Sequence, residues 1–273
     1  EQTSSIYRNV STRNNIALAK VFNISPEDLQ PWHYNLNLNE NPKNEINKYF
    51  KSVDDVTKMD FSLYKKKGWD IPSLPITLDL LPREGKNQHC YSFDIDKNRD
   101  SRILANLRPD LYSQETLMHE LGHGVYSLGI SSHLPYFDQN FASHSMTEAF
   151  AVMNEKLATR EGCYSEYLNV PKELSNKLKS KSLEDSLNYI RFCLHFITFE
   201  KQLYVNPEQD IAKLWYENQF KYQNKPIPKV LDNRWASERT HLTSDPAYYQ
   251  SYFRAEIIAS QIYEAATAKL GKL

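Results

Sequence analysis

Residues 116–123 read TLMHELGH and contain the pattern H-E-x-x-H. On a helix, His119 and His123 lie four residues apart and therefore on one face, a single turn from each other. Their imidazole rings can converge on one Zn²⁺ at about 2.0–2.1 Å. Glu120 points beside such an ion rather than at it, so its carboxylate can take a proton from an attacking water molecule. The stretch therefore predicts a helix that carries a catalytic centre with one zinc ion per chain.

The residues around this stretch indicate that it is helical. From Ser113 onward the apolar residues repeat with a period of about 3.6, which is typical of a helix. Leu117, Leu121 and Val125 form one apolar face, with Met118 beside them. The alternative interpretation is a surface helix that carries two unrelated histidines.

A catalytic zinc ion needs a third protein ligand and an open position. The metzincin pattern requires glycine at 126 and histidine at 129, and Tyr126 and Gly129 exclude it. Glu148 stands near the start of a second predicted helix at residues 146–160, whereas His144 precedes this helix in a predicted loop. We favour Glu148 as the third ligand, because a helix can hold its carboxylate against the first helix. His144 is the rival ligand.

The rest of the chain predicts a mainly helical protein with a small antiparallel β-sheet beside the active-site helix. Only seven glycines are present, strand-like runs are few, and residues 31–60 read as mostly irregular and polar. Because no strong linker interrupts the sequence, we expect a single catalytic domain over residues 1–273. Strands are predicted at 76–81, 90–95 and 102–107, a turn at 26–30, and helices at 12–22, around 43–51, 146–160, 175–199, 208–222 and 249–270.

The composition excludes several classes of protein. The 273 residues are 40% hydrophobic with a mean hydropathy of -0.65, and no apolar run could span a bilayer, so no membrane association is expected. A net charge of -1 argues against a nucleic-acid partner. Cys90, Cys163 and Cys193 are too scattered for a disulfide framework or a cysteine zinc site. The chain begins at Glu1 without a visible signal peptide, so we expect a soluble protein and favour the cytoplasm, with the compartment left open.

The zinc motif and the later glutamate together resemble the gluzincin oligopeptidases, which include thimet oligopeptidase, oligoendopeptidase F and angiotensin-converting enzyme. The resemblance rests on His119-Glu120-Leu121-Gly122-His123 followed by Thr147-Glu148-Ala149. The thermolysin branch fits less well, because its gap between the second histidine and the glutamate is shorter. The resemblance implies a zinc metallopeptidase that hydrolyses short extended oligopeptides, as a peptidyl-dipeptidase or an oligoendopeptidase.

A second similarity precedes the motif. Residues 89–94, HCYSFD, are similar to the segment His-Ala-Ser-Ala-Trp-Asp of angiotensin-converting enzyme, at the same distance before the zinc motif. The resemblance implies that His89 donates to a substrate carbonyl and that the strand, with Cys90, binds the substrate backbone. A peptide added to a sheet edge is held extended by main-chain hydrogen bonds, whatever its side chains. Taken alone, His89 would read as a loop histidine.

A third similarity lies near the C-terminus, where RTH and the tyrosine-rich residues 248–253 are similar to Lys-Phe-His and two following tyrosines in angiotensin-converting enzyme. By this resemblance Tyr252 donates its hydroxyl to the developing oxyanion, and His241 binds a substrate carbonyl and assists there. Losing one such donor typically costs about 10²–10³ in rate. One extra residue after His241 leaves open which tyrosine is the donor. For any single tyrosine, the alternative is packing on an amphipathic helix.

The same segment bears on specificity. By the resemblance, Tyr249 or Tyr248 faces the C-terminal side of the substrate. A family lysine at the position of Arg239 grips the free carboxylate of the substrate, so that dipeptides are released. Arginine could do the same with bidentate geometry. If Arg239 is instead a solvated surface charge, an endopeptidase is equally consistent.

The resemblance covers residues 76–262, and relatives of this architecture are much longer because of an additional N-terminal half. In the family, that half supplies much of the opposite wall and lid of a groove. The chain is then a fragment, one of two associated chains, or a short form with an open cleft. The alternative function is a catalytically incomplete, zinc-containing peptide-binding half that needs a second chain or segment. Further rivals are a structural zinc site closed by His144 and a metallohydrolase acting on something other than peptides.

Overall fold

The structure is a computed structural model that describes residues 3–35, 41–97, 99–140, 142–232 and 240–271. Contacts divide the chain into two compact units, each assembled from two segments. The motif unit comprises Asn39–Lys181 and Arg254–Leu273, and the aromatic unit comprises Glu1–Leu38 and Ser182–Phe253. Single-domain organisation over residues 1–273 stays a prediction. Among the residues described, none of the helices combines the length and the apolar character needed to cross a bilayer.

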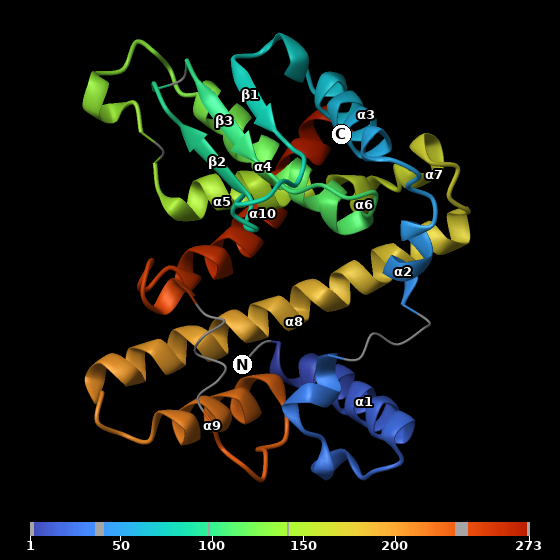
Figure 1. The fold of residues 1–273 in the computed structure, drawn as a ribbon, viewed down its shortest axis with the longest axis vertical. Coiled ribbons are helices and arrows are strands. Elements are labelled where there is room, and N and C mark those ends of the chain that lie inside the picture. The colour runs from blue at the N-terminus through green and yellow to red at the C-terminus, as the bar shows by residue number, and fades with distance from the viewer. Residues whose placement is uncertain (1–2, 36–40, 98, 141, 233–239, 272–273) are drawn as a thin grey trace. The chain divides into compact units, whose positions relative to one another are not determined.

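The motif unit holds a small sheet and most of the helices, which confirms the mainly helical class (Figure 1). It also contains the start of α8 (Lys172–Val205) and most of α10 (Tyr249–Leu270). Its other elements are α2 (Pro42–Asn47), α3 (Val53–Lys66), β1 (Ile76–Asp79), β2 (Tyr91–Asp94), β3 (Ser101–Leu104), α4 (Leu111–Leu128), α5 (His144–Glu155), α6 (Leu157–Glu161) and α7 (Tyr164–Tyr167), with short 3₁₀ turns at Ile71–Ser73 and Tyr136–Asp138.

The sheet is mixed, which corrects the prediction of an antiparallel sheet. The strand order is β1-β3-β2, with β2 antiparallel to β3 and β1 parallel to β3. A short connection separates β2 from β3, whereas a longer connection separates β1 from β2. That connection allows the chain to cross over, so that β3 can enter the sheet between them in the direction of β1. Within the described residues, β2 therefore forms an edge of the sheet.

Helix α4 carries the H-E-x-x-H motif and has the buried face that the periodicity predicted. Its N-terminus is capped by Asp110, whose side chain accepts a hydrogen bond from the main-chain nitrogen of Ser113 at 2.8 Å. Leu117, Leu121 and Val125 are at most 1% exposed and belong to the main core of the motif unit. The opposite face of α4 is left to carry the two histidines.

Helix α3 lies partly in the region that the sequence predicted to be irregular, so that prediction was wrong. Ser52 and Asp55 form a capping box at its start. Val56, Met59 and Leu63 follow at helical spacing and are buried. The signal was present in the sequence, but the aspartates and lysines between these apolar residues made the segment read as polar. The helix predicted at 146–160 is likewise divided, because α5 ends at Glu155 and α6 begins at Leu157.

The aromatic unit is helical in the residues described. It contains α1 (Ser4–Phe22), which begins earlier than the predicted residue 12, most of α8, α9 (Ile211–Gln223) and the first turn of α10. Short 3₁₀ turns occur at Pro26–Asp28, Pro31–Asn35 and Thr240–Leu242. Its core is built largely from aromatic side chains and comprises Cys193, Phe196, Phe199, Leu214, Trp215, Tyr216 and Tyr249.

Lys86 anchors the connection between β1 and β2. Its side chain is only 1% exposed, and Nζ lies 2.9 Å from the carboxylate of Asp79. Nζ also donates to the main-chain oxygens of Asp79, Leu81 and Ala105 at 2.9, 2.9 and 2.5 Å. One buried ammonium thus joins the end of β1, the connection that follows it and the residue after β3.

Replacing Lys86 with methionine is expected to lower the free energy of unfolding by about 2–5 kcal/mol, because buried carbonyls left without a donor cost about 1–3 kcal/mol each. Urea denaturation followed by circular dichroism measures the change. Arg83→Met is the control, since Arg83 is an exposed partner of the same Asp79 carboxylate and exposed pairs contribute about 0–1 kcal/mol. Equal losses in the two variants would contradict the anchoring role.

Candidate metal centre

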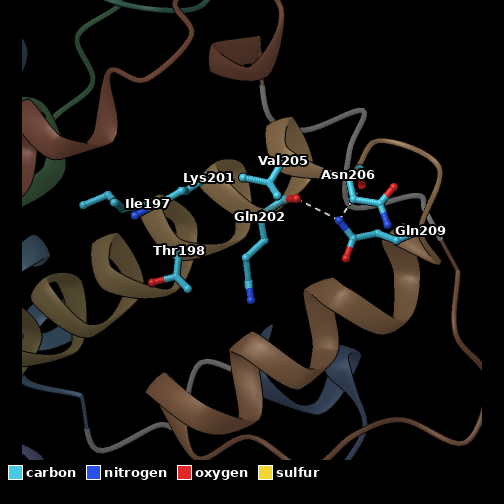
Figure 2. A pocket seen from close by; sticks show the side chains of 7 residues that line it. All are labelled: Ile197, Thr198, Lys201, Gln202, Val205, Asn206 and Gln209. Atoms are coloured by element: carbon cyan, nitrogen blue, oxygen red, sulfur yellow. Dashed lines mark hydrogen bonds between the residues drawn. The ribbon is translucent and has the colours of Figure 1, made fainter.

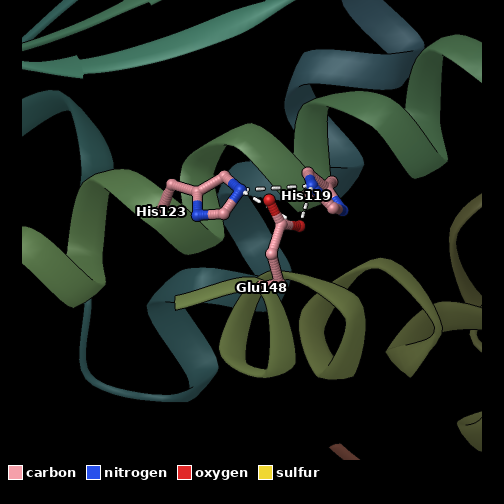
Figure 3. Close-up of side chains that lie close together, drawn as sticks. All are labelled: His119, His123 and Glu148. Atoms are coloured by element: carbon pink, nitrogen blue, oxygen red, sulfur yellow. Dashed lines mark hydrogen bonds and ion pairs between the residues drawn. The ribbon is translucent and has the colours of Figure 1, made fainter. Parts of the chain in front are cut away.

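Three side chains converge between α4 and α5 (Figure 3). His119 and His123 project from α4, and their Nε2 atoms are 3.2 Å apart. Glu148 projects from α5, and its Oε2 lies 3.5 Å from Nε2 of His119 and 3.7 Å from Nε2 of His123. In the described part of the chain, these residues form the group of His, Cys, Asp or Glu side chains that could hold a metal ion, with ligand atoms within 4.8 Å of one another.

The spacing of the three ligand atoms fits a zinc ion. Tetrahedral zinc with bonds of about 2.0–2.1 Å holds its ligand atoms about 3.3 Å apart, close to the observed 3.2, 3.5 and 3.7 Å. Two imidazole nitrogens and one carboxylate oxygen are also the donor set of catalytic zinc sites that keep a fourth position open. His144, the rival ligand, is the first residue of α5 and does not belong to this group.

Gly122 allows the two helices to approach closely enough for this convergence. A Cβ atom built at Gly122 would lie 2.8 Å from the Cα atom of Ala151 on α5, closer than real Cβ contacts. Ala149 and Ala151 are themselves fully buried. Glycine between the two histidines therefore brings the backbone of α5, and with it Glu148, against the ligand-bearing face of α4.

Two further side chains orient the histidines, and the sequence analysis missed both. Nδ1 of His119 lies 2.8 Å from a carboxylate oxygen of Glu155, and Nδ1 of His123 lies 2.8 Å from the hydroxyl of Thr147. Such contacts fix the ring orientation and leave Nε2 to face the metal. Glu155 stands two helical turns after Glu148 and Thr147 directly before it, so helical spacing on α5 was the signal that could have found them.

Burial and neighbouring charges set the protonation of this cluster. Burial raises the pKa of Glu120 to about 7. Burial and the charge of His119 lower the pKa of His123 to about 4, which leaves a neutral imidazole, the form that binds metals. Although burial opposes it, the contacts with Glu148 and Glu155 hold the pKa of His119 well above its usual range. Metal binding at His119 is therefore expected to release a proton.

A hollow of about 270 Å³ lies beside the ligands. It brings the predicted site residues His89, Cys90 and Glu120 together with His119. Three residues of α4 that precede the motif complete much of its wall, and the sequence analysis had given them no role. The lining residues are His89, Cys90, Tyr112, Glu115, Thr116, His119, Glu120 and Glu155.

A larger hollow, of about 450 Å³, lies in the aromatic unit at the end of α8 (Figure 2). Its lining contains no histidine, cysteine or carboxylate, so it offers neither the ligands of a zinc site nor a carboxylate base. The chemistry of the motif unit, rather than the size of the hollow, identifies the candidate centre. The residues that line the larger hollow are Ile197, Thr198, Lys201, Gln202, Val205, Asn206 and Gln209.

The predicted C-terminal site residues gather in the aromatic unit. The ring of His241 lies 5.1 Å from that of Tyr249 and 5.9 Å from those of Tyr248 and Tyr252. The hydroxyl of Tyr252 is 3.5 Å from Nε2 of His241. Tyr249 is only 7% exposed and stacks on Phe196, so Tyr248 has more surface to offer a substrate. The roles of these residues stay predictions, and Arg239 lies outside the described residues.

Replacing Glu155 with glutamine is expected to weaken zinc binding about 10–100-fold, because an amide orients and polarises the imidazole of His119 less strongly than a carboxylate does. Competition with a chromophoric chelator at fixed pH measures the affinity. Glu166→Gln makes the same change at an exposed side chain that pairs with Lys66 and is expected to bind zinc as the unmodified chain does. If both variants bind zinc equally well, Glu155 has no such role.

Comparisons with known proteins agree with this fold. The model of a family described as Peptidase family M3 matches residues 15–271. No curated protein matches the chain. The solved structure of PZ peptidase A with inhibitor 2 is similar with a TM-score of 0.61 and 18% identity, covering 95% of this chain and 46% of that chain.

Two solved structures described as oligoendopeptidase F are also similar. One, from Bacillus anthracis str. Ames, has a TM-score of 0.58 and 16% identity over 98% of this chain and 47% of that chain. The other has a TM-score of 0.59 and 16% identity over 97% and 48%. At these identities the likeness shows the fold alone. The chain spans about half the length of the solved proteins it matches.

Proposed function

The chain belongs to peptidase family M3, and on that premise we propose that it is a zinc metallopeptidase that hydrolyses short, extended peptides. The observation that carries this proposal is the convergence of His119, His123 and Glu148 beside a hollow that is also lined by Glu120. Three ligands with an open position and an adjacent carboxylate are the parts that metal-assisted hydrolysis needs.

The candidate site residues of the motif unit each have a defined role in this proposal. His119, His123 and Glu148 hold the zinc ion, which when bound supplies a Lewis acid that activates water and polarises the peptide carbonyl. Glu120 accepts a proton from the attacking water and later passes it to the leaving amine. Its side chain is largely buried, which keeps bulk water from competing for the proton. Glu155 keeps His119 oriented while this happens.

Strand β2 supports an extended peptide as the substrate. The main-chain nitrogen of Ile95 donates to the oxygen of Asp100 at 2.8 Å, and hydrogen-bonded pairs alternate along an antiparallel ladder. The main-chain groups of Ser92, and of Cys90 before it, therefore point away from β3. A peptide that pairs with this edge is held extended by main-chain hydrogen bonds. Because Cys90 also lines the hollow beside Glu120, such a peptide reaches the catalytic carboxylate.

The remaining roles in the proposal fall to the C-terminal residues that the resemblance singles out. Tyr252 donates its hydroxyl to the oxyanion, and His241, 3.5 Å from that hydroxyl, assists by binding a substrate carbonyl. Tyr248, rather than the buried Tyr249, faces the C-terminal side of the substrate. Arg239 determines which of two modes of cleavage occurs. If its guanidinium binds the free C-terminal carboxylate of the substrate, the enzyme is a peptidyl-dipeptidase; if it does not, the enzyme is an oligoendopeptidase.

Mass spectrometry of a decapeptide incubated with the zinc-loaded chain tests the proposal, with chelator-treated protein as the control. Stepwise loss of two residues from the C-terminus is expected of a peptidyl-dipeptidase, and internal cuts are expected of an oligoendopeptidase. If zinc binds and the peptide binds but nothing is cleaved, the enzyme proposal fails. That result would favour a catalytically incomplete peptide-binding half that needs a second chain or segment.

A further inference from the structure

A row of large side chains leads away from the candidate metal centre along one face of β2. Tyr91 and Phe93 alternate within β2, so they project toward the same face, and His89 and Ile95 continue the same spacing before and after the strand. Their rings follow one another, with centroids 6.4 Å apart between His89 and Tyr91 and 5.6 Å apart between Tyr91 and Phe93. Tyr91, Phe93 and Ile95 are 40%, 46% and 54% exposed. We call these four residues the β2 row.

The β2 row lies on the outer face of the sheet. The inner face packs on α4, where a Cβ atom at Gly124 would lie 3.2 Å from the hydroxyl of Ser101 and 3.5 Å from the side chain of Ile103. Those two residues pair with Asp94 and Ser92 of β2, so the inner face is the one opposite the row. Large apolar side chains on the outer face thus stay half-exposed.

The β2 row has neighbouring side chains from β3 on one side and the edge of the sheet on the other. Across β3, Tyr91 pairs with Leu104 and Phe93 pairs with Arg102, whose guanidinium is held by Asp100 at 2.6 Å. On the other side the row borders the edge of the sheet, because β2 pairs with β3 alone in the described part of the sheet. A strand added at that edge would place every second side chain directly beside the row.

We propose that Tyr91 and Phe93 select the substrate, favouring aromatic or β-branched apolar side chains at alternate positions on one side of the scissile bond. The inference rests on the proposed function. Side chains directly opposite each other on one sheet face have Cβ atoms about 4.5–5.5 Å apart, and each aromatic pair is favoured over alanine about 1.4- to 5-fold. Substrate side chains at the intervening positions point to the other face and escape this selection.

We expect the substrate peptide to cover the β2 row, because the row is continuous with the hollow beside the candidate metal centre. His89 belongs to the β2 row and also lines the hollow together with Glu120 and His119. A peptide paired with β2 therefore runs from the reacting carbonyl straight along the row. The reading direction of the peptide does not affect the expectation, since in either direction the contacted residues are two apart.

Cleavage of a peptide series with phenylalanine or serine at each position in turn tests the inference, using the zinc-loaded chain and kcat/KM as the readout. The unmodified chain is expected to prefer phenylalanine about 1.4- to 5-fold at two positions, two residues apart and on one side of the cut. Phe93→Thr and Tyr91→Thr are each expected to remove one of these preferences, measured as the ratio of kcat/KM for the phenylalanine peptide to kcat/KM for the serine peptide at that position. Threonine keeps a high preference for strands.

Arg102→Thr is the matched control, because Arg102 is exposed on the same sheet face but lies on β3, away from the edge. It is expected to keep both preferences. The inference would be overturned if phenylalanine were preferred at adjacent positions, on both sides of the scissile bond, or nowhere in the peptide. In each of these cases, cleavage of the peptides would still support the proposed function. The inference would also be overturned if Phe93→Thr and Tyr91→Thr each preferred phenylalanine as strongly as the unmodified chain does.

A failure of the proposed function is distinguishable from a failure of the inference. The same peptides, labelled with a fluorophore, are titrated with zinc-loaded protein and followed by anisotropy. If no peptide is cleaved, the enzyme proposal falls, and an alternating preference in Kd still supports the selection by Tyr91 and Phe93. Equal Kd values across the series would overturn the selection as well.

Discussion

Replacing Glu120 with glutamine is expected to lower kcat for peptide hydrolysis by about 10²–10⁴-fold, the usual contribution of a general base, while one zinc ion per chain stays bound. Glutamine fills the same space beside His119 but cannot accept a proton from water. The three metal ligands are untouched by the change. A fluorogenic peptide assay gives kcat, and atomic absorption gives the zinc content of the same sample.

The matched control for this variant is Glu166→Gln, which makes the same change at an exposed side chain that pairs with Lys66. It is expected to retain the hydrolytic rate, because Glu166 does not line the hollow beside Glu120. Full activity in Glu120→Gln would sink the proposed mechanism. Loss of zinc from Glu120→Gln would instead mean that Glu120 is a ligand and that the cluster is arranged differently.

Replacing His123 with alanine is expected to lower zinc affinity by more than about 10²-fold, since even a residue that only orients a ligand typically contributes 10–100-fold. When less than one zinc ion per chain is supplied, peptide hydrolysis by the variant is expected to be lost as well. Removing His123 leaves His119 and Glu148 as a two-ligand site without the geometry of a catalytic zinc centre. Competition with a chelator gives the affinity, and equilibrium dialysis gives the stoichiometry.

His133→Ala is the control for the loss of an imidazole, because His133 lies exposed in the connection that follows α4. It is expected to bind zinc with unchanged affinity. If His123→Ala keeps its zinc, the ligand set is wrong, and His144 becomes the first residue to test. A double variant, His123→Ala with His144→Ala, would then distinguish a substitute ligand from an original one.

The convergence of His119, His123 and Glu148 could be predicted because most of its signal is local. His119 and His123 share one helical face, and the period of 3.6 around them depends only on neighbouring residues. Glu148 followed from a second helix close by in the sequence. Its approach to the histidines, however, depends on Gly122 and on Ala151 of α5. The resemblance to the gluzincins pointed to Glu148 but could not show why the two helices come so close.

Local sequence also misled in places. Charged residues hid the apolar face of α3, although Ser52 and Asp55 marked its start. The strands were found, yet their pairing was not, because strand propensity carries no information about neighbours in the sheet. Parallel pairing of β1 with β3 is decided by the connection anchored through Lys86 and by the burial of one sheet face against α4.

The sequence by itself thus determined the mainly helical class and the helix that carries His119, Glu120 and His123 on neighbouring positions, since these depend on residue type and on spacing within a few turns. The tertiary structure alone decided that Glu155 contacts His119, that β2 lies at the edge of a mixed sheet in the described residues, and that Tyr91 and Phe93 stay half-exposed. The physical reason is that hydrogen bonds and burial between distant segments arise only when the chain packs. No local pattern encodes which segment becomes the partner.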